Sequence, residues 1–364
     1  MAINKIVWDL EPHTEAKHRI LKKYIEAWIP ILSKFHRRLV YIDAFAGPGI
    51  YSKGEPGSPI IVINAAINNR TKNKFEFVCL AIEMDPPRYQ SLKDEIDKLH
   101  LPDSIKINID KGDSNLVLGN LLTKIEQKGT VLAPTFAFID PFNYDVSFDL
   151  IKRLFQNKKC EIFISFMYNG IIRNIPNTTE SEKLDRFFGT KEWRKANKMN
   201  GNSKKAFLHD LYMKQLHDLD RDGKKEETLV RSFEMIDQQN KTSYFLFYVT
   251  KNILGLAKMK EAMWNIDKTG NFVFSDNTDP RQTVLFTLDE TNILENQIIS
   301  HFRGKEISIS EIEQFVVSKT AFLATHYKGV LKNLEEKGFL KSLTPRKKKL
   351  TYPPGTIIKI ERYN

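Results

Sequence analysis

Apolar positions along this chain follow two different spacings in alternation. Short apolar runs predict strands at residues 39–45, 75–82, 105–109, 135–139 and 161–166. Between them, apolar residues three or four positions apart predict helices at 12–36, 58–69, 87–100, 116–128 and 148–156. Because the strands are apolar throughout, we expect an α/β fold of the Rossmann-like class, in which helices cover both faces of a parallel sheet.

The pattern changes after the fifth predicted strand. Residues 174–228 are polar, and we interpret them as an insertion before the sheet closes with late strands at 243–249 and 271–275. Further on, the spacing predicts helices at 292–302, 308–317 and 320–337 and short strands at 339–343 and 356–360. Three helices followed by a basic hairpin are typical of a winged helix-turn-helix. The predicted domains are residues 1–280 and 285–364.

Composition narrows the class of protein. Hydrophobic residues make up 41% of the chain and charged residues 28%, as in globular proteins. No apolar run approaches the length of a membrane span, and the first residues lack the apolar core of a signal peptide. Cys79 and Cys160 both lie in apolar runs, which predicts buried, reduced thiols in a cytoplasmic protein. No Cys/His spacing indicates a metal site.

Positive charge is concentrated at one end. The net charge is +11, and the last 24 residues contain seven basic side chains against one acidic side chain. Such a cluster favours a polyanionic partner, most simply a nucleic acid. The alternative is a solvated tail that aids solubility.

The sequence VYIDAFAGPG at residues 40–49 predicts a strand that opens into a nucleotide-binding loop. A dinucleotide site needs a third glycine where this chain has Ser52, and a nucleoside-triphosphate loop needs a Gly-Lys-Ser/Thr motif that is missing. An S-adenosylmethionine site instead uses an acid, an aromatic residue and two glycines at two-residue steps. Asp43, Phe45, Gly47 and Gly49 fit that spacing.

Three further acids end successive predicted strands. Glu83 follows the second strand and is the candidate ligand of the ribose hydroxyls, with Asp85 as its rival. Asp113 follows the third strand and could accept from an adenine amino group. Asp140 follows the fourth. The carboxyl ends of parallel strands meet at one edge, so we expect these acids in one crevice.

The last of these acids begins the sequence Asp140-Pro141-Phe142. Enzymes that methylate amino groups place a similar motif, with two prolines, at this point of the sheet. Asp140 would orient the target amine and accept its proton, and Phe142 would stack on a base extruded from its helix. The alternative is that Asp140 caps the next helix. His13, Lys17 and His18 on the first helix are candidates for contact with the cofactor or the substrate, against the alternative of an exposed helix face.

These motifs resemble a known family. The chain is similar to class I S-adenosylmethionine-dependent methyltransferases and more closely to the three-Cys-motif partner proteins (TcmP). The resemblance covers WDLEPHTEAKHRIL (8–21), VYIDAFAGPGIY (40–51), GSP (57–59), IEMDP (82–86), FIDPF (138–142), FFGTKEW (187–193) and LGLAKMKEAMW (254–264). It implies cofactor contacts at Gly47, Gly49, Glu83 and Asp113. It also implies a partner protein with a three-cysteine motif, similar to radical S-adenosylmethionine enzymes.

The leading hypothesis is therefore a methyltransferase that acts on an amino nitrogen of a nucleic-acid base. One alternative is a non-catalytic subunit that binds the cofactor or DNA beside the three-Cys-motif protein, and another is a regulator that has lost its cofactor. In the winged helix, the recognition helix and the wing would contact nucleic acid, although a protein-docking winged helix is also consistent with the pattern. The candidate contacts are Thr320, Thr325, His326, Lys328, Arg346, Lys347, Lys348 and Lys349.

Overall fold

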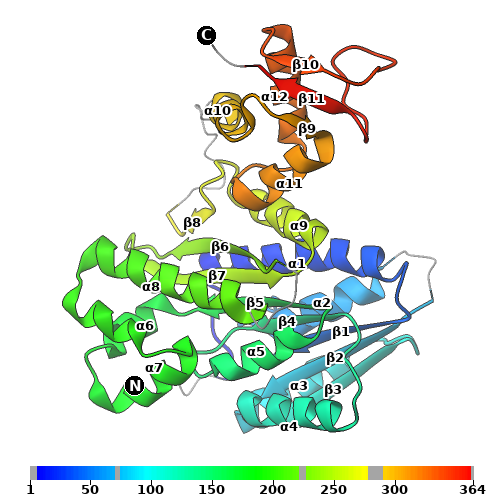
Figure 1. Ribbon diagram of the computed structural model, residues 1–364. Helices are drawn as coiled ribbons and strands as arrows, with labels where there is room; N and C mark the ends of the chain where they lie inside the picture. The colour runs from blue at the N-terminus through cyan, green and yellow to red at the C-terminus, as the bar shows by residue number, and fades with distance from the viewer. Residues whose placement is uncertain (1–5, 70–73, 221–226, 278–289, 362–364) are drawn as a thin grey trace. The chain divides into compact units, whose positions relative to one another are not determined.

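The computed structural model describes residues 6–69, 74–220, 227–277 and 290–361 (Figure 1). Internal contacts divide the chain into two compact units. The first comprises Met1–Ala262 and Val273–Thr278, and the second comprises Met263–Phe272 and Asp279–Asn364. Each unit is described separately below. The predicted domain boundary at 280–285 lies outside the described residues.

An eight-stranded sheet with the order β3-β2-β1-β4-β5-β7-β6-β8 forms the centre of the first unit. The first five strands are parallel, β7 runs antiparallel to β5 and β6, and β8 pairs parallel with β6. The predicted Rossmann-like sheet is thereby confirmed. The strands are β1 (Arg38–Asp43), β2 (Glu76–Glu83), β3 (Ile105–Lys111), β4 (Thr135–Ile139), β5 (Cys160–Phe166), β6 (Leu229–Ile236), β7 (Thr242–Thr250) and β8 (Val273–Ser275).

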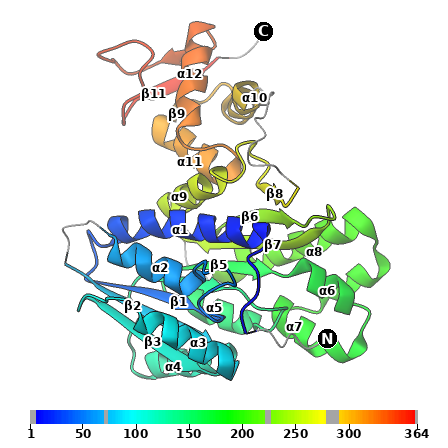
Figure 2. The same cartoon turned by 180° about the vertical axis from the view of Figure 1, so that it is seen from behind.

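Helices cover both faces of this sheet, as Figures 1 and 2 show from opposite sides. One face packs against α4 (Ser114–Gln127) and α5 (Phe148–Gln156) in a continuous hydrophobic core. On the other face, α1 (Pro12–Leu32) packs on α2 (Ser58–Ile67) and places Tyr24 and Trp28 on the ring of Phe136 in β4. The sheet also contacts α3 (Pro86–Asp97), through β2 and β3.

A buried polar cluster fixes α1 to the sheet. The hydroxyl of Tyr24 donates to the Glu161 carboxylate in β5 at 2.7 Å and lies 2.7 Å from the hydroxyl of Tyr248 in β7. Burial raises the pKa of Glu161, although hydrogen bonds from Tyr24 and Thr250 oppose the rise. A Cβ at Gly255 would lie 2.5 Å from the Glu161 carboxylate, so only glycine lets α9 (Ile253–Trp264) approach this cluster.

The polar segment after β5 is an integral part of the core. Its helices are α6 (Tyr168–Asn174), η1 (Thr178–Glu180), α7 (Ser181–Phe188), η2 (Glu192–Lys198), α8 (Gly201–His217) and η3 (Asp218–Asp220). Phe187 in α7 stacks on Tyr212 in α8, with ring centroids 5.0 Å apart, and both rings are fully buried. The predicted insertion therefore buries large aromatic side chains behind its polar surface. Strand β6, which follows it, was not predicted.

The second unit is a winged helix-turn-helix, as predicted. Its elements are α10 (Glu290–Phe302), β9 (Glu306–Ser308), α11 (Ile309–Lys319), α12 (His326–Glu336), β10 (Leu340–Ser342) and β11 (Ile357–Ile360), with the strands in the order β10-β11-β9. Ser308 and Glu311 form a capping box that starts α11. The last helix begins at His326 rather than Thr320, because Thr320 adopts an extended backbone and its hydroxyl bonds back to the Val316 carbonyl.

Within the described residues, every helix is too short or too polar to span a membrane. Cys79 and Cys160 are both buried and free, and burial raises the pKa of each thiol. Both thiols therefore have the low reactivity of core residues.

Candidate functional site

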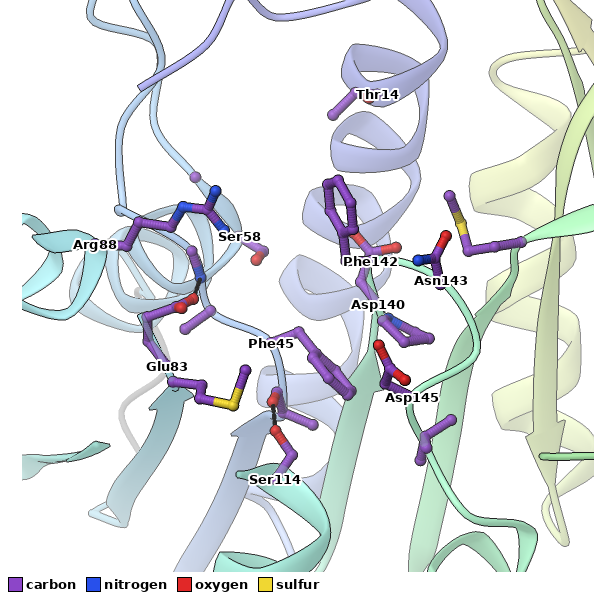
Figure 3. Close-up of a pocket in the computed structure, with 18 of the residues that line it drawn as sticks. Thr14, Phe45, Ser58, Glu83, Arg88, Ser114, Asp140, Phe142, Asn143 and Asp145 are labelled. Carbon is purple, nitrogen blue, oxygen red and sulfur yellow. Dashed lines mark hydrogen bonds between the residues drawn. The ribbon is translucent and has the colours of Figure 1, made fainter. Parts of the chain in front are cut away.

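A cavity of about 830 Å³ opens at the carboxyl ends of β1, β2 and β4. Here the chain leaves β1 toward one face of the sheet and leaves β4 toward the other face. Open α/β sheets bind ligands in the crevice at such a point. Figure 3 shows the cavity with Glu83 and Arg88 on one side of Phe45, and Asp140, Phe142 and Asn143 on the other. Among the predicted cofactor-binding and catalytic residues, Phe45, Gly47, Gly49, Glu83, Asp113, His13, Lys17, Asp140, Pro141 and Phe142 line this cavity.

The loop after β1 depends on its glycines. Gly47 and Gly49 have φ angles of 67° and 79°, in the left-handed region that side chains disfavour. The Gly57 amide donates to the Gly49 carbonyl at 2.8 Å, and a Cβ at Gly57 would lie 3.1 Å from the Gly49 backbone. A Cβ at Gly47 would meet no atom within 4 Å, so the space above this glycine is open to a ligand.

Glu83 is held in place by backbone amides. Its side chain is buried and accepts from the amide of Gly47 and from the amide of Asp85, both at 2.8 Å. The glycine loop and the end of β2 are thus joined through one carboxylate. Its rival Asp85 also lines the cavity, but it caps α3 by accepting from the Arg88 amide at 3.0 Å. Of these two acids, Glu83 is the one whose side chain accepts from the glycine loop.

Asp113 and Asp43 have structural contacts as well. Asp113 lines the cavity and caps α4, accepting from the Leu116 amide at 3.0 Å. Asp43 differs from the expectation: it is fully buried beneath the loop, outside the cavity wall, and accepts from the Tyr41 hydroxyl at 2.8 Å. Burial raises the pKa of Asp43 to about 7, and hydrogen bonds from Ser58 and Tyr41 offset only part of the rise. This residue supports the loop from below.

The first helix brings two charged groups to the cavity. Lys17 is almost fully buried and its ammonium lies 2.5 Å from the Asp140 carboxylate, 5.2 Å from the centre of the Tyr244 ring. The alternative interpretation of Asp140 as a helix cap does not apply, because the next helix, α5, is capped by Ser147, whose hydroxyl accepts from the Leu150 amide at 3.2 Å. This ion pair connects the segment before β1 with the end of β4.

His13 and His18 lie on the same helix in opposite electrostatic surroundings. His13 is 2.9 Å from both the Glu11 and the Asp276 carboxylates. Burial opposes the charged form of His13, but the two carboxylates outweigh it and raise its pKa. Complete burial, reinforced by the Lys17 charge, lowers the pKa of His18 to about 3, so its ring is neutral and packs on Tyr51.

The opposite wall carries aromatic and amide groups. The Phe142 side chain is 63% exposed, unusual for phenylalanine, and lines the cavity beside Asn143. A Cβ at Gly170 in α6 would lie 3.0 Å from the Asn143 amide oxygen, so glycine makes room for this side chain. Neither Asn143 nor Tyr244 was among the site residues predicted from the sequence. Tyr244 could not be predicted from the sequence because only the sheet pairing brings β7 next to α1. There the Tyr244 hydroxyl donates to the His13 carbonyl at 3.0 Å.

The predicted nucleic-acid contacts of the second unit divide into two groups. Thr325 and Lys328 at the start of α12, and Lys347–Lys349 in the wing, are exposed. Thr320 is buried, and the ring of His326 packs on Trp264 with centroids 4.9 Å apart. Arg346 is engaged by both carboxylate oxygens of Glu335, at 2.9 and 2.5 Å. It therefore braces the wing against α12, whereas the three lysines remain available to a phosphate backbone.

Comparison with known proteins gives one family match. A family model described as GMT-like wHTH domain matches residues 273–347, in agreement with the winged helix. No curated protein matches the chain by sequence.

The solved structures to which the chain is similar include methyltransferases. Trm1 from Pyrococcus horikoshii with S-adenosyl-L-methionine is 11% identical, with 99% of this chain and 93% of that chain covered and a TM-score of 0.39. An O-methyltransferase from Bacillus cereus in complex with SAH is 12% identical (63% and 80% covered, TM-score 0.34). The human methyltransferase 10 domain containing protein is 14% identical (64% and 82% covered, TM-score 0.30). At these values none of the three assigns an activity to the chain.

The two histidines of α1 give a testable pH dependence. We expect the imidazole of His13 to titrate above the ordinary value of 6.5, and that of His18 to stay neutral well below it. Because the folded state holds the His13 proton more tightly than the unfolded state, the resulting stabilisation is complete below about pH 6.5 and is lost as the pH rises through the raised pKa.

Imidazole resonances in NMR spectra, assigned with His13→Gln and His18→Gln, measure both pKa values. A His13 ring that titrates below the ordinary value of 6.5, or a His18 ring that titrates near that value, would contradict the pKa shifts expected from burial and the neighbouring charges.

Proposed function

We propose that this protein is an S-adenosylmethionine-dependent methyltransferase that acts on an amino nitrogen of a nucleic-acid base. One observation carries the proposal. A single cavity holds a carboxylate fixed by the glycine loop, Glu83, and a carboxylate paired with a buried lysine, Asp140, on opposite sides of Phe45. The first suits the hydroxyls of a nucleoside and the second suits an amine.

The cofactor half lies between the glycine loop, β2 and β3. Glu83 would accept from the ribose hydroxyls with the lone pairs that its two amide partners leave unused. Asp113, which lines the same wall, would accept from the adenine amino group. The open space above Gly47 allows the backbone to approach the ligand closely. When bound, S-adenosylmethionine supplies an electrophilic methyl group on a sulfonium.

The acceptor half is formed by Asp140, Phe142 and Asn143. Asp140 would accept a hydrogen bond from the target amino group and orient its lone pair, which is the main requirement of an in-line displacement. Lys17 holds this carboxylate in one orientation through its 2.5 Å contact. The exposed ring of Phe142 would stack on the base, and Asn143 would read the base edge.

The Lys17 contact also favours a second candidate function. One oxygen of Asp140 is already occupied by the ammonium group, and the motif has a single proline. The protein could therefore bind the cofactor as a non-catalytic subunit. In either role we propose a three-Cys-motif protein as its partner, which rests on the resemblance of the motifs alone.

Replacement of Glu83 tests the cofactor half. We expect Glu83→Gln to weaken S-adenosylmethionine binding about tenfold or more, because one amide group cannot accept from both backbone amides and both hydroxyls. Isothermal titration with S-adenosylmethionine measures the change. Asp85→Asn is the matched control and should stay within about threefold of wild type, since asparagine also caps a helix. The reverse ranking would assign the ribose to Asp85, and no binding by wild type would refute the proposal.

Replacement of Asp140 tests the acceptor half. We expect Asp140→Asn to lower transfer of a labelled methyl group from S-adenosylmethionine to DNA or RNA by about a hundredfold. The double variant Lys17→Met, Asp140→Asn removes both charges, so no buried ammonium is left unpaired. It should fold, bind the cofactor and remain inactive. Cofactor binding by wild type without transfer to any nucleic acid would favour the non-catalytic subunit.

The winged helix offers a separate test of nucleic-acid binding. Gly329 is the fourth residue of α12, exposed and next to Lys328, and a Cβ there would meet no atom within 4 Å. Glycine in a helix interior costs about 0.5–1 kcal/mol relative to alanine. No contact within the described part of the second unit requires this glycine, so we propose that it lets a nucleic-acid backbone approach the helix.

We expect Gly329→Ala to raise the free energy of unfolding by about 0.5–1 kcal/mol. The same substitution should weaken binding of fluorescein-labelled duplex DNA of mixed sequence. Gln314→Ala, at an exposed position of α11, is the control and should leave DNA binding unchanged. Fluorescence anisotropy measures affinity and calorimetry measures stability. A Gly329→Ala protein that is more stable and binds DNA as well as wild type would exclude close contact at α12.

A further inference from the structure

The segment between β5 and β6 contributes positive charge to the cavity. Arg173 from α6 and Lys183 and Arg186 from α7 all line it, and the remaining lining residues from these two helices, Asn169 and Gly170, are uncharged. Because α6 and α7 pack against β7 and α5, these side chains belong to the acceptor side of the sheet. We call Arg173, Lys183 and Arg186 the basic rim.

The charges of the basic rim are largely available. Arg186 is exposed and makes no hydrogen bond or ion pair with any residue in the described part of the chain. Arg173 donates through its Nε to the Asn169 carbonyl of its own helix at 3.0 Å, a contact that uses one of its five N–H groups. Lys183 is 56% exposed and lies 3.4 Å from Glu180, a loose surface pair of little energetic weight.

Carboxylates line both sides of the cavity, and most of its exposed cations lie on the acceptor side. The cofactor side presents Glu83, Asp85 and Asp113 at the ends of β2 and β3, with Arg88 partly paired to Asp85 at 3.9 Å. The acceptor side presents the basic rim around Phe142 and Asn143, together with Asp145 and with Asp140, whose charge is compensated by Lys17. Carboxylates suit hydroxyl and amino groups and repel phosphates, whereas unpaired guanidinium groups bind phosphate oxygens. A phosphate-bearing substrate would consequently meet more exposed cations on the acceptor side than on the cofactor side.

We propose that the basic rim binds the backbone phosphates that flank the base presented to Asp140. This inference rests on the proposed function and extends it: the substrate is a nucleotide within a nucleic-acid strand rather than a free nucleoside. An acidic peptide is the other polyanion that such a rim could hold. The exposed ring of Phe142 and the Asn143 amide favour a base, because stacking and edge hydrogen bonds are how proteins hold unstacked nucleotides.

The proposal gives the polar segment a function that its sequence did not suggest. Its helices α7 and α8 bury aromatic rings on one side, and α7 carries Lys183 and Arg186 on another. The packing of Phe187 on Tyr212 therefore fixes the helix from which two of the three cations extend. Gly189 follows α7 in the left-handed conformation, with φ of 64°, and ends the helix. The helix therefore stops directly after the residues that line the cavity or pack beneath it.

The experiment uses a double variant, Arg173→Gln with Arg186→Gln, which we call the rim variant. Its control is Lys198→Gln, which changes an exposed lysine of the same segment outside the cavity wall. The probe is a fluorescein-labelled single-stranded oligonucleotide of about twelve nucleotides that contains all four bases. We expect the rim variant to bind it at least tenfold more weakly at low salt. The slope of log affinity against log salt should become shallower by about 0.7 for each phosphate that the variant no longer neutralises.

Three parallel measurements separate the possible outcomes. S-adenosylmethionine affinity by titration should be unchanged in the rim variant, which shows that the site is folded. Oligonucleotide binding is measured again in proteins in which Lys347, Lys348 and Lys349 are changed to glutamine. The rim substitutions should weaken binding by the same factor in this background, which excludes a contribution of the wing. Methyl transfer should fall in proportion to binding and recover when the oligonucleotide is supplied at saturating concentration, as expected for a positioning contact.

Each result decides something. Rim variants that bind the oligonucleotide like wild type overturn the inference, even if wild type methylates nucleic acid. Rim-dependent oligonucleotide binding without any methyl transfer by wild type supports the rim as a nucleic-acid contact and refutes the proposed methylation. Rim-dependent binding of poly-glutamate, with no rim effect on the oligonucleotide, overturns the inference in favour of an acidic peptide.

Discussion

The divergence of the chain after β1 and β4 is the constraint on which the cavity depends. These strands pair side by side, yet the loop after β1 turns toward α2 and the loop after β4 turns toward α5. The resulting crevice, outside the carboxyl ends of the two strands, is where open α/β sheets bind ligands. Glu83 closes one side by accepting from the Gly47 amide, and Lys17 closes the other by reaching Asp140.

Four acids at strand ends take on different roles because their surroundings differ. Asp43 is fully buried, and its pKa of about 7 suits a hydrogen-bonded support for the loop rather than a ligand group. Glu83 is buried as well, but two backbone amides compensate its charge and leave lone pairs for a ligand. Asp113 combines a helix cap with a place in the cavity wall. Asp140 alone is paired with a cation, which distinguishes the acceptor side from the cofactor side.

A similar division occurs in the winged helix. The run Arg346–Lys349 forms one basic cluster in the sequence, but Arg346 makes a two-oxygen ion pair with Glu335 and lies 5.2 Å from the Tyr352 ring. The planar guanidinium fits a carboxylate in this way, whereas the neighbouring lysines stay solvated. The wing is therefore anchored to α12 by its first cation, while Lys347–Lys349 form its exposed surface.

The sequence by itself determined the strand–helix order, the glycine loop, the acids at the strand ends and the winged helix, because local periodicity and backbone preferences encode these features. Tertiary structure decided the rest. Strand β6 was missed because Arg231, Ser232 and Glu234 interrupt its apolar pattern, and only pairing with β7 through a turn at Asn240 defines it. Pairing between distant segments likewise selected Lys17 as the partner of Asp140 and buried Asp43. Those contacts join residues far apart in the chain, and no local pattern specifies which distant groups the packed sheet will bring together.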